Sequence, residues 1–253
     1  MSVAAPSLND QQLGEMLGLI KSADSVELKL TVDVDQQRSA VEALKMDPLE
    51  ARLRLVHFFD TPELALEASG LVVRARRIQG RGDDSVVKLR PVLPDDLSAE
   101  LRDSRDFFVE VDAMPGGYVC SGSLKGAPTK AGIREVLGEG QPLRRLFSKS
   151  QRRFFADHAP DGINLDDLSL LGPVFVLKLK AAPPGFDRRL TVELWLFPDG
   201  SRILELSSKC ATNEAFQVAA EARAFLAERG IETGAQQQTK TRKALELFSQ
   251  RLR

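Results

Sequence analysis

Hydrophobic and polar residues alternate with a period of two along most of the chain after residue 24. In Val26–Val34, for example, Leu28 and Leu30 alternate with Glu27 and Lys29. Successive side chains of a β-strand point to opposite faces, so this alternation predicts strands with one apolar and one polar face. The predicted strands are Val26–Val34, Arg52–Phe59, Leu71–Ile78, Ser85–Val92, Asp106–Asp112, Gln151–Ala156, Pro173–Lys180, Leu190–Phe197 and Arg202–Lys209.

Other segments space their apolar residues by three or four positions, as amphipathic helices do. The predicted helices are Ser7–Ile20, Gln36–Lys45, Pro62–Ala68, Lys130–Leu137, Asn213–Arg229 and Thr241–Leu252. No segment between the predicted elements has the composition of a linker, so we expect a helical extension over residues 1–24 and a single α+β domain over residues 25–253. An antiparallel sheet of about eight or nine strands tends to close into a barrel, because closure removes its exposed edges.

Charged residues recur on the polar face of nearly every predicted strand. The sets are Lys29 with Glu27, Arg74 with Arg76, Lys88 with Arg90, Glu110 with Asp112, Lys178 with Lys180, and Glu205 with Ser207 and Lys209. The simplest explanation is a sheet with its charged face in water. However, the predicted helices need the apolar face of the sheet to cover their own apolar stripes. If helices cover the outside of a closed barrel, the charged residues line its interior.

A charged barrel interior is costly unless each charge is paired or meets a ligand. Arginine presents a planar fork of donors to phosphate oxygens, and lysine presents a compact point charge. Magnesium needs only one or two protein carboxylates when phosphates and water supply its other ligands. The alternation therefore predicts a tunnel that binds a polyanion such as a phosphate chain.

The overall composition excludes several other classes of protein. The chain has 35 Lys and Arg against 36 Asp and Glu, a net charge of -1, so it has no global basic field for nucleic acid or an anionic membrane. No apolar run reaches the roughly 20 residues of a membrane-spanning helix. Residues 1–6 lack the features of a signal peptide, and two cysteines with two histidines favour neither a disulfide framework nor a zinc site. We expect a cytoplasmic protein with neither a nucleic-acid nor a membrane partner.

Several of these strands also resemble the motifs of a known family. Val26–Leu30 is similar to a first strand of the form Glu-x-Glu-x-Lys, and His57–Pro62 followed by Leu71–Arg76 resembles Tyr-Phe-Asp-Thr-Pro and Leu-x-x-Arg-x-Arg. Val87–Arg90 resembles the next, lysine-bearing strand, and Ile203–Lys209 the closing acidic strand. Thr239 and Lys240 weakly resemble a Ser-Lys pair before the last helix. These are motifs of the CYTH superfamily, or triphosphate tunnel metalloenzymes, which includes class IV adenylyl cyclases, thiamine triphosphatases and inorganic triphosphatases.

The resemblance implies a closed, eight-stranded antiparallel tunnel with helices packed outside, which binds a triphosphate together with Mg²⁺ or Mn²⁺. It implies that phosphate oxygens are held by Lys29, Arg74 and Arg76, which we take as catalytic, and by Lys88 and Arg90. Either Arg152 or Arg153 adds a further phosphate contact. We also assign Lys178 and Lys209 to phosphate binding, because they lie on the charged faces of their strands. It implies metal binding by Glu27 and Glu205, with Glu110 and Glu193 as further acidic positions.

The chain also departs from the family pattern. Ser25 stands in place of the first glutamate of the first strand, and Ser207 in place of the second acid of the closing pair. Lys178 and Lys180 occupy positions where acids might stand. Each serine removes a metal-facing carboxylate, and the two lysines lie in the half of the tunnel where acids are expected, so the number of metals stays open.

Three functions follow from these observations. The first is a metal-dependent triphosphatase, and the second is a class IV adenylyl cyclase that makes cyclic AMP from ATP. The third is a non-catalytic module that binds polyphosphate or a nucleotide, favoured by Ser25 and Ser207. We rank the triphosphatase first because the remaining carboxylates suffice for a magnesium ion that its substrate carries. The sequence leaves open whether the protein is a monomer or a homodimer.

Overall fold

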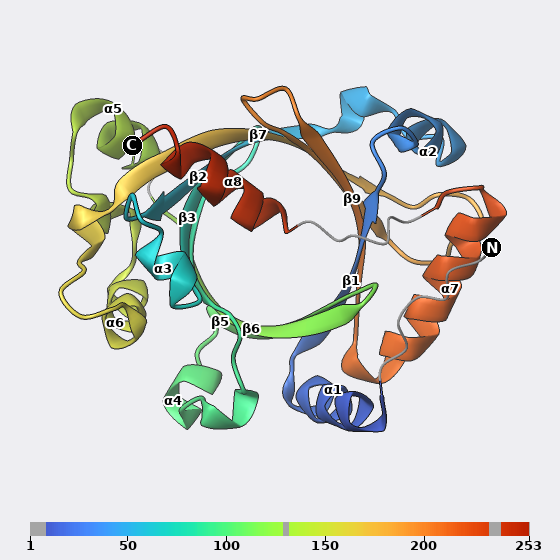
Figure 1. The fold of residues 1–253 in the computed structure, drawn as a ribbon, viewed down its shortest axis with the longest axis horizontal. Helices are drawn as coiled ribbons and strands as arrows, with labels where there is room; N and C mark the ends of the chain where they lie inside the picture. Colours follow the sequence, from blue (N-terminus) through green and yellow to red (C-terminus); the bar gives the residue numbers. More distant parts are fainter. Residues whose placement is uncertain (1–8, 129–131, 233–238, 253) are drawn as a thin grey trace.

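In the computed structural model of the protein, the described residues are 9–128, 132–232 and 239–252. Within these residues nine strands form one closed barrel in the order β1-β5-β6-β4-β3-β2-β7-β8-β9, which Figure 1 shows end-on. The strands are β1 (Ser25–Val32), β2 (Arg52–Asp60), β3 (Leu71–Ile78), β4 (Asp84–Leu89), β5 (Phe107–Met114), β6 (Gly117–Gly126), β7 (Ser169–Ala181), β8 (Leu190–Leu196) and β9 (Arg202–Cys210).

The closed barrel confirms the α+β prediction, but the expectation of eight antiparallel strands is wrong in two respects. The barrel has nine strands in the described part of the chain, and β1 and β5 pair in parallel, from Ser25 opposite Glu110 to Leu28 opposite Ala113. All other neighbours in the barrel are antiparallel. Local alternation shows which residues share a face, but it does not show which strand lies alongside.

One strand was missed and one predicted strand is a helix. The missed strand is β6, whose many glycines and serines hide its alternation; a Cβ at Gly122 would lie 2.7 Å from the Phe107 ring. Conversely, the predicted strand Gln151–Ala156 lies inside helix α6 (Lys149–His158), which begins at a capping box between Ser148 and Gln151.

The other helices in the described residues are α1 (Asp10–Ser22), α2 (Gln37–Ala43), α3 (Ala65–Ala68), α4 (Ala99–Arg102), α5 (Gly132–Glu139), α7 (Ala215–Glu228) and α8 (Lys240–Ser249). All but the short α4, which was not predicted, lie close to their predicted positions. The predicted starts of the first helix at Ser7 and of another at Lys130 fall outside the described residues. None of the helices in the described ranges is long and apolar enough to cross a membrane.

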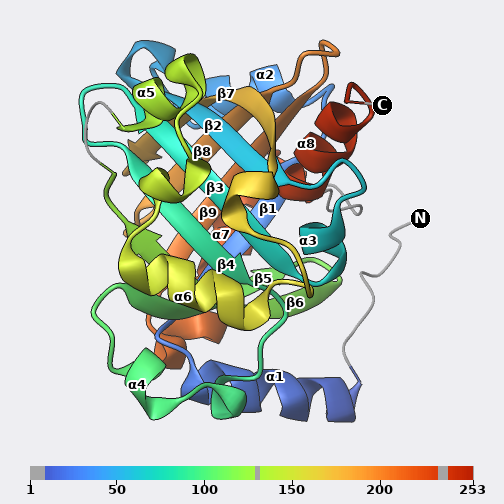
Figure 2. The ribbon, with the colours of Figure 1, turned by 90° about the vertical axis from the view of Figure 1, so that its left-hand side faces the viewer.

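The helices surround the barrel, except for α8, which lies across one of its mouths (Figures 1 and 2). Outward-facing residues such as Leu190 and Leu206 pack with Phe225 of α7 in one apolar cluster. At the mouth, Leu245 of α8 packs with inward-facing residues that include Trp195. The apolar faces of the strands are therefore covered by helices, and the charged faces are enclosed.

Candidate functional site

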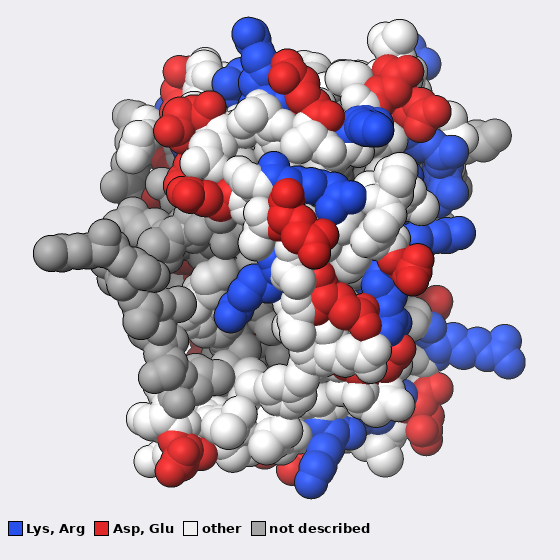
Figure 3. Space-filling view, turned by 90° about the vertical axis from the view of Figure 1, so that its right-hand side faces the viewer, with Lys and Arg blue, Asp and Glu red and all other residues white. Residues whose placement is uncertain are grey.

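The barrel encloses a cavity of about 400 Å³ with an excess of positive charge. Its lining includes eleven Lys and Arg and five Asp and Glu among the described residues, although the whole chain has a net charge of -1. On the outer face in Figure 3, by contrast, acidic and basic side chains are interspersed. The positive charge of the molecule is therefore concentrated inside the barrel.

One side of the cavity, which we name the basic wall, is formed by β2, β3 and β4. Its cations are Arg54, Arg74, Arg76, Lys88 and Arg90. Arg76 is neutralised by Asp84, to which it donates two hydrogen bonds of 2.7 and 2.5 Å. The Nε atoms of Arg54 and Arg74 are buried and have no hydrogen-bond partner, and neither guanidinium forms an ion pair with a carboxylate of the described chain.

Burial disfavours the charged form of several cations of the basic wall, Arg74 and Lys88 among them. Burial, followed by the charge of Arg76, lowers the pKa of Arg74 to about 10. Burial lowers the pKa of Lys88 to about 8, although Asp112 acts in the opposite direction. An anionic ligand in the cavity would relieve both effects, since an opposite charge nearby favours the charged form.

The opposite side, which we name the acidic wall, consists of Glu27, Glu110, Asp112, Glu193 and Glu205 on β1, β5, β8 and β9. The Asp112 side chain is fully buried, with Lys29 Nζ at 2.6 Å, Lys88 Nζ at 3.7 Å and an Arg90 nitrogen at 3.8 Å. Burial alone would raise the pKa of Asp112, but these cations outweigh it and lower the pKa to about 2. Asp112 is therefore a carboxylate that bridges the two walls.

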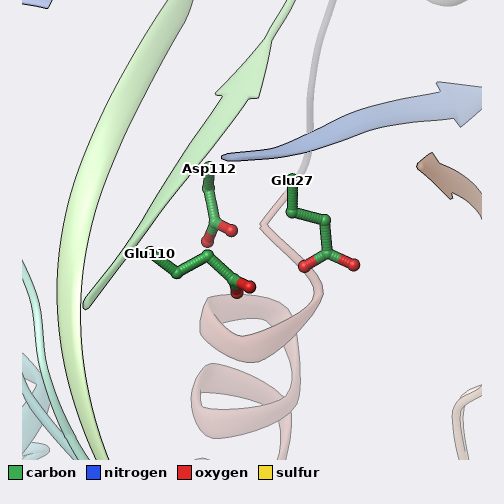
Figure 4. A group of neighbouring side chains, drawn as sticks. All are labelled: Glu27, Glu110 and Asp112. Carbon is green, nitrogen blue, oxygen red and sulfur yellow. The ribbon is translucent and has the colours of Figure 1, made fainter. Parts of the chain in front are cut away.

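Three carboxylates of the acidic wall form a compact group. One ligand oxygen from each of Glu27, Glu110 and Asp112 lies within 4.8 Å of the others, and Figure 4 shows the side chains extending into the same region. Hard oxygen ligands in such a group fit Mg²⁺ or Mn²⁺. Lys29 and Lys209 already pair with this group, at 3.2 Å from Glu27 and 2.5 Å from Glu110, so a metal would compete with two lysines.

The two serines that replace family acids lie beside this group. Ser25 Oγ donates to Glu110 at 3.4 Å, and Ser207 Oγ donates to Glu27 at 2.9 Å. Each hydroxyl orients a carboxylate without adding charge. The group therefore contains three acids, two of which accept a hydrogen bond from a serine hydroxyl.

The remaining two acids are neutralised by lysines. Lys240, the first residue of α8, places its Nζ 2.5 Å from Glu193 and 2.6 Å from Glu205. Glu193 also accepts hydrogen bonds from Lys178 at 2.7 Å and from Trp195 at 3.1 Å. Although burial opposes ionisation, Lys240 and Lys178 hold the pKa of Glu193 well below its ordinary value. Glu27 and Glu205, both predicted to bind metal, therefore lie in different groups. Glu27 lies with Glu110 and Asp112, whereas Glu205 shares Lys240 with Glu193.

The predicted site residues divide into those that line the cavity and those that do not. The residues in the lining are Lys29, Arg74, Arg76, Lys88, Arg90, Lys178, Lys209, Glu27, Glu110, Glu193 and Glu205. Arg152 and Arg153 lie on α6 instead of on a strand, and they are absent from the lining. Arg152 donates to backbone carbonyls, and the 73% exposed Arg153 side chain pairs with Glu100 and Asp157. Their assignment to the tunnel is wrong because the predicted strand is a helix.

The sequence reasoning also left five charged residues of the lining without a site role: Arg54, Asp112, Lys125, Lys180 and Lys240. Arg54 alternates with Leu53 and Leu55, and Asp112 shares a face with Glu110, so the strand pattern contains a signal for both. Lys125 lies on the missed strand β6, with its Nζ 4.5 Å from the centre of the Phe108 ring. Lys240 is in the Thr-Lys pair that the resemblance singled out.

Two solved structures share this fold over most of the chain. A Hippeastrum protein assigned as an adenylyl cyclase, with a dominant triphosphatase activity, has a TM-score of 0.63 and 17% identity and covers 87% of this chain and 94% of its own. A Bacillus halodurans protein assigned as an adenylate cyclase has a TM-score of 0.61 and 13% identity and covers 87% of this chain and 97% of its own. No protein-family profile matches the chain, and no curated protein is similar to it in sequence. The chain therefore shares the fold of these two structures over most of its length.

Proposed function

We propose that the tunnel binds a triphosphate or polyphosphate chain and that the protein hydrolyses it with a divalent cation. The observation that carries this proposal is the basic wall, where Arg54 and Arg74 are enclosed without a carboxylate partner in the described chain. Buried cations without counter-charges are costly, and a phosphate chain would supply the counter-charges. The dominant triphosphatase activity of the Hippeastrum protein agrees with this choice among phosphate reactions.

The residues of the tunnel suit phosphoryl transfer, which depends on positioning and on cations near the developing negative charge. Arg74, Lys88 and Arg90 would bind and orient phosphate oxygens, and the closed barrel would limit the access of water. Glu27, Glu110 and Asp112 would hold the divalent cation. When bound, such an ion polarises a phosphoryl oxygen as a Lewis acid.

A second candidate, a non-catalytic phosphate binder, is favoured by the pairing of the acidic wall. Each of its five carboxylates has a lysine within 3.2 Å, which leaves none of them free for a metal without rearrangement. In this case the same basic wall would bind the phosphate chain, and Lys29, Lys209 and Lys240 would take the place of metal ions.

The test is product analysis after incubation with tripolyphosphate or ATP, with and without Mg²⁺ or Mn²⁺. Orthophosphate released only with metal supports the triphosphatase. Cyclic AMP with pyrophosphate would identify a cyclase, and binding without turnover would identify the non-catalytic module. Glu27→Gln should abolish release, whereas the matched surface variant Glu100→Gln should not change it. Full activity of Glu27→Gln would contradict the assigned metal group.

A further inference from the structure

The cations of the basic wall lie at successive levels along the strands. Lys88 on β4 is opposite Val72 on β3, and Arg74 and Arg76 follow on β3 itself. Arg54 on β2 is opposite Ile78, at the far end of β3. The strand register therefore arranges these cations as a diagonal row over three neighbouring strands.

This row is longer than a triphosphate. The levels of Val72 and Ile78 are six residues apart on β3, which corresponds to about 20 Å at roughly 3.3 Å per residue. The outer phosphorus atoms of a triphosphate are joined by four bonds, and at about 1.5 Å per bond they are at most about 6 Å apart. A triphosphate held between Lys88 and Arg74 thus leaves Arg54 beyond its end.

Arg54 nevertheless has the surroundings of an anion-binding residue. Its side chain lines the cavity, its Nε is buried without a partner, and no carboxylate of the described chain forms an ion pair with it. Burial, and after it the nearby charge of Arg76, lowers the pKa of Arg54. Arg76 is already neutralised by Asp84, so the uncompensated charge at this end of the row belongs to Arg54.

We propose that Arg54 forms an outer subsite that binds the phosphates beyond the third, so that the tunnel prefers inorganic polyphosphate to tripolyphosphate. This inference rests on the proposed function, since it requires that the basic wall binds phosphate. The subsite would make the affinity of the tunnel depend on the length of the phosphate chain. Arg54 extends the anion path, whereas Arg74 contacts chains of any length.

The test compares dissociation constants for tripolyphosphate and for linear polyphosphate of about ten phosphates, measured by calorimetry without metal. Arg54→Gln should weaken polyphosphate binding about tenfold and change tripolyphosphate binding less than twofold, since one charge-assisted contact is lost only with the longer ligand. Arg74→Gln should weaken both. The control is Arg77→Gln, because Arg77 is exposed and carries the same charge on the same strand as Arg74.

Equal effects of Arg54→Gln on both ligands, or no effect on either, would overturn the subsite and leave the proposed function intact. If the unmodified protein binds neither ligand, both proposals fail. A length series from three to eight phosphates on the unmodified protein tests the same point without a variant. Its affinity should rise beyond three phosphates until the chain reaches Arg54 and then level off, and a maximum at three would contradict the subsite.

Discussion

The two walls of the tunnel bury similar numbers of charges but compensate them in different ways. On the acidic wall, each carboxylate has a lysine of the same chain within 3.2 Å. On the basic wall, Asp84 neutralises Arg76, and Asp112 lies 3.7 Å from Lys88 and 3.8 Å from Arg90. Arg54 and Arg74 have no carboxylate partner in the described residues.

This difference separates the wall whose charges stabilise the fold from the wall whose cations are free to bind phosphate. The acids and lysines of the acidic wall form ion pairs within the protein. Removing one partner therefore leaves the other buried and uncompensated. Unpaired arginines already have this unfavourable arrangement in the free protein. Substitutions on the acidic wall should therefore lower stability, and substitutions on the basic wall should lower ligand affinity.

The largest expected effect is at Asp112. Asp112→Asn would leave Lys29 without its partner at 2.6 Å and would leave Lys88 and Arg90 facing each other without a carboxylate. We expect the free energy of unfolding to fall by about 3–5 kcal/mol, as for other buried pairs that lose one partner. Denaturant titration measures this loss.

The control for Asp112 is Asp157→Asn, which removes the exposed ion pair with Arg153 on α6. An exposed pair of this kind contributes less than about 1 kcal/mol. If both variants lose equally little stability, the acidic wall is not the stabilising part of the tunnel.

The second effect is on ligand affinity at Arg74. Arg74→Met should weaken tripolyphosphate binding by about 1.5–3 kcal/mol, the usual range for a hydrogen bond to a charged group, or roughly 10- to 150-fold. The unliganded protein should be as stable as before or more stable, because a buried charge without a partner is removed. Calorimetry and thermal unfolding measure the two quantities. A destabilised protein with unchanged affinity would reverse the roles that we assign to the walls.

A smaller effect follows from the titration of Lys88. Its pKa of about 8 in the folded protein is below its ordinary value of 10.5, so the ammonium loses its proton between pH 7 and pH 9. If only the charged form binds phosphate, tripolyphosphate affinity should fall up to about tenfold over this range, because one pKa unit corresponds to 1.36 kcal/mol. Lys88→Arg should remove this pH dependence. Constant affinity of the unmodified protein from pH 7 to pH 9 would contradict it.

The titration of Lys88 also affects the stability of the free protein. Stability should rise with pH, whereas ligand affinity should fall. The unfolded chain binds more protons at Lys88 than the folded chain does between about pH 8 and pH 10.5, so stability should rise with pH in this range. Lys88→Met should flatten this rise.

Much of the basic wall could be predicted from the sequence, because the direction of its side chains depends only on the alternation within each strand. Arg74 and Arg76, like Lys88 and Arg90, alternate with apolar residues that the helices cover, so their direction follows from strand geometry. Arg152 was misplaced because the short run around it fits either a strand or a helix. The capping box at Ser148 favours the helix. So does the buried Gln151, whose side chain forms hydrogen bonds with Ser85 and Leu124.

The acidic wall was less predictable because it depends on long-range pairing. Asp112 lies beside Glu27 only because β1 and β5 pair in parallel, and no local pattern contains this register. The role of Lys240 depends on the position of α8 over the mouth of the barrel. The sequence shows that Asp112 and Lys240 are charged, but it does not show which residues they pair with.

The most direct test of the division between the walls is a crystal structure of the protein soaked with tripolyphosphate and Mn²⁺. We predict that the phosphates contact Arg74, Lys88 and Arg90 and that the anomalous signal of manganese lies among Glu27, Glu110 and Asp112. Phosphate bound only on the outer surface, with Arg74 still unpaired and manganese outside the tunnel, would contradict the account.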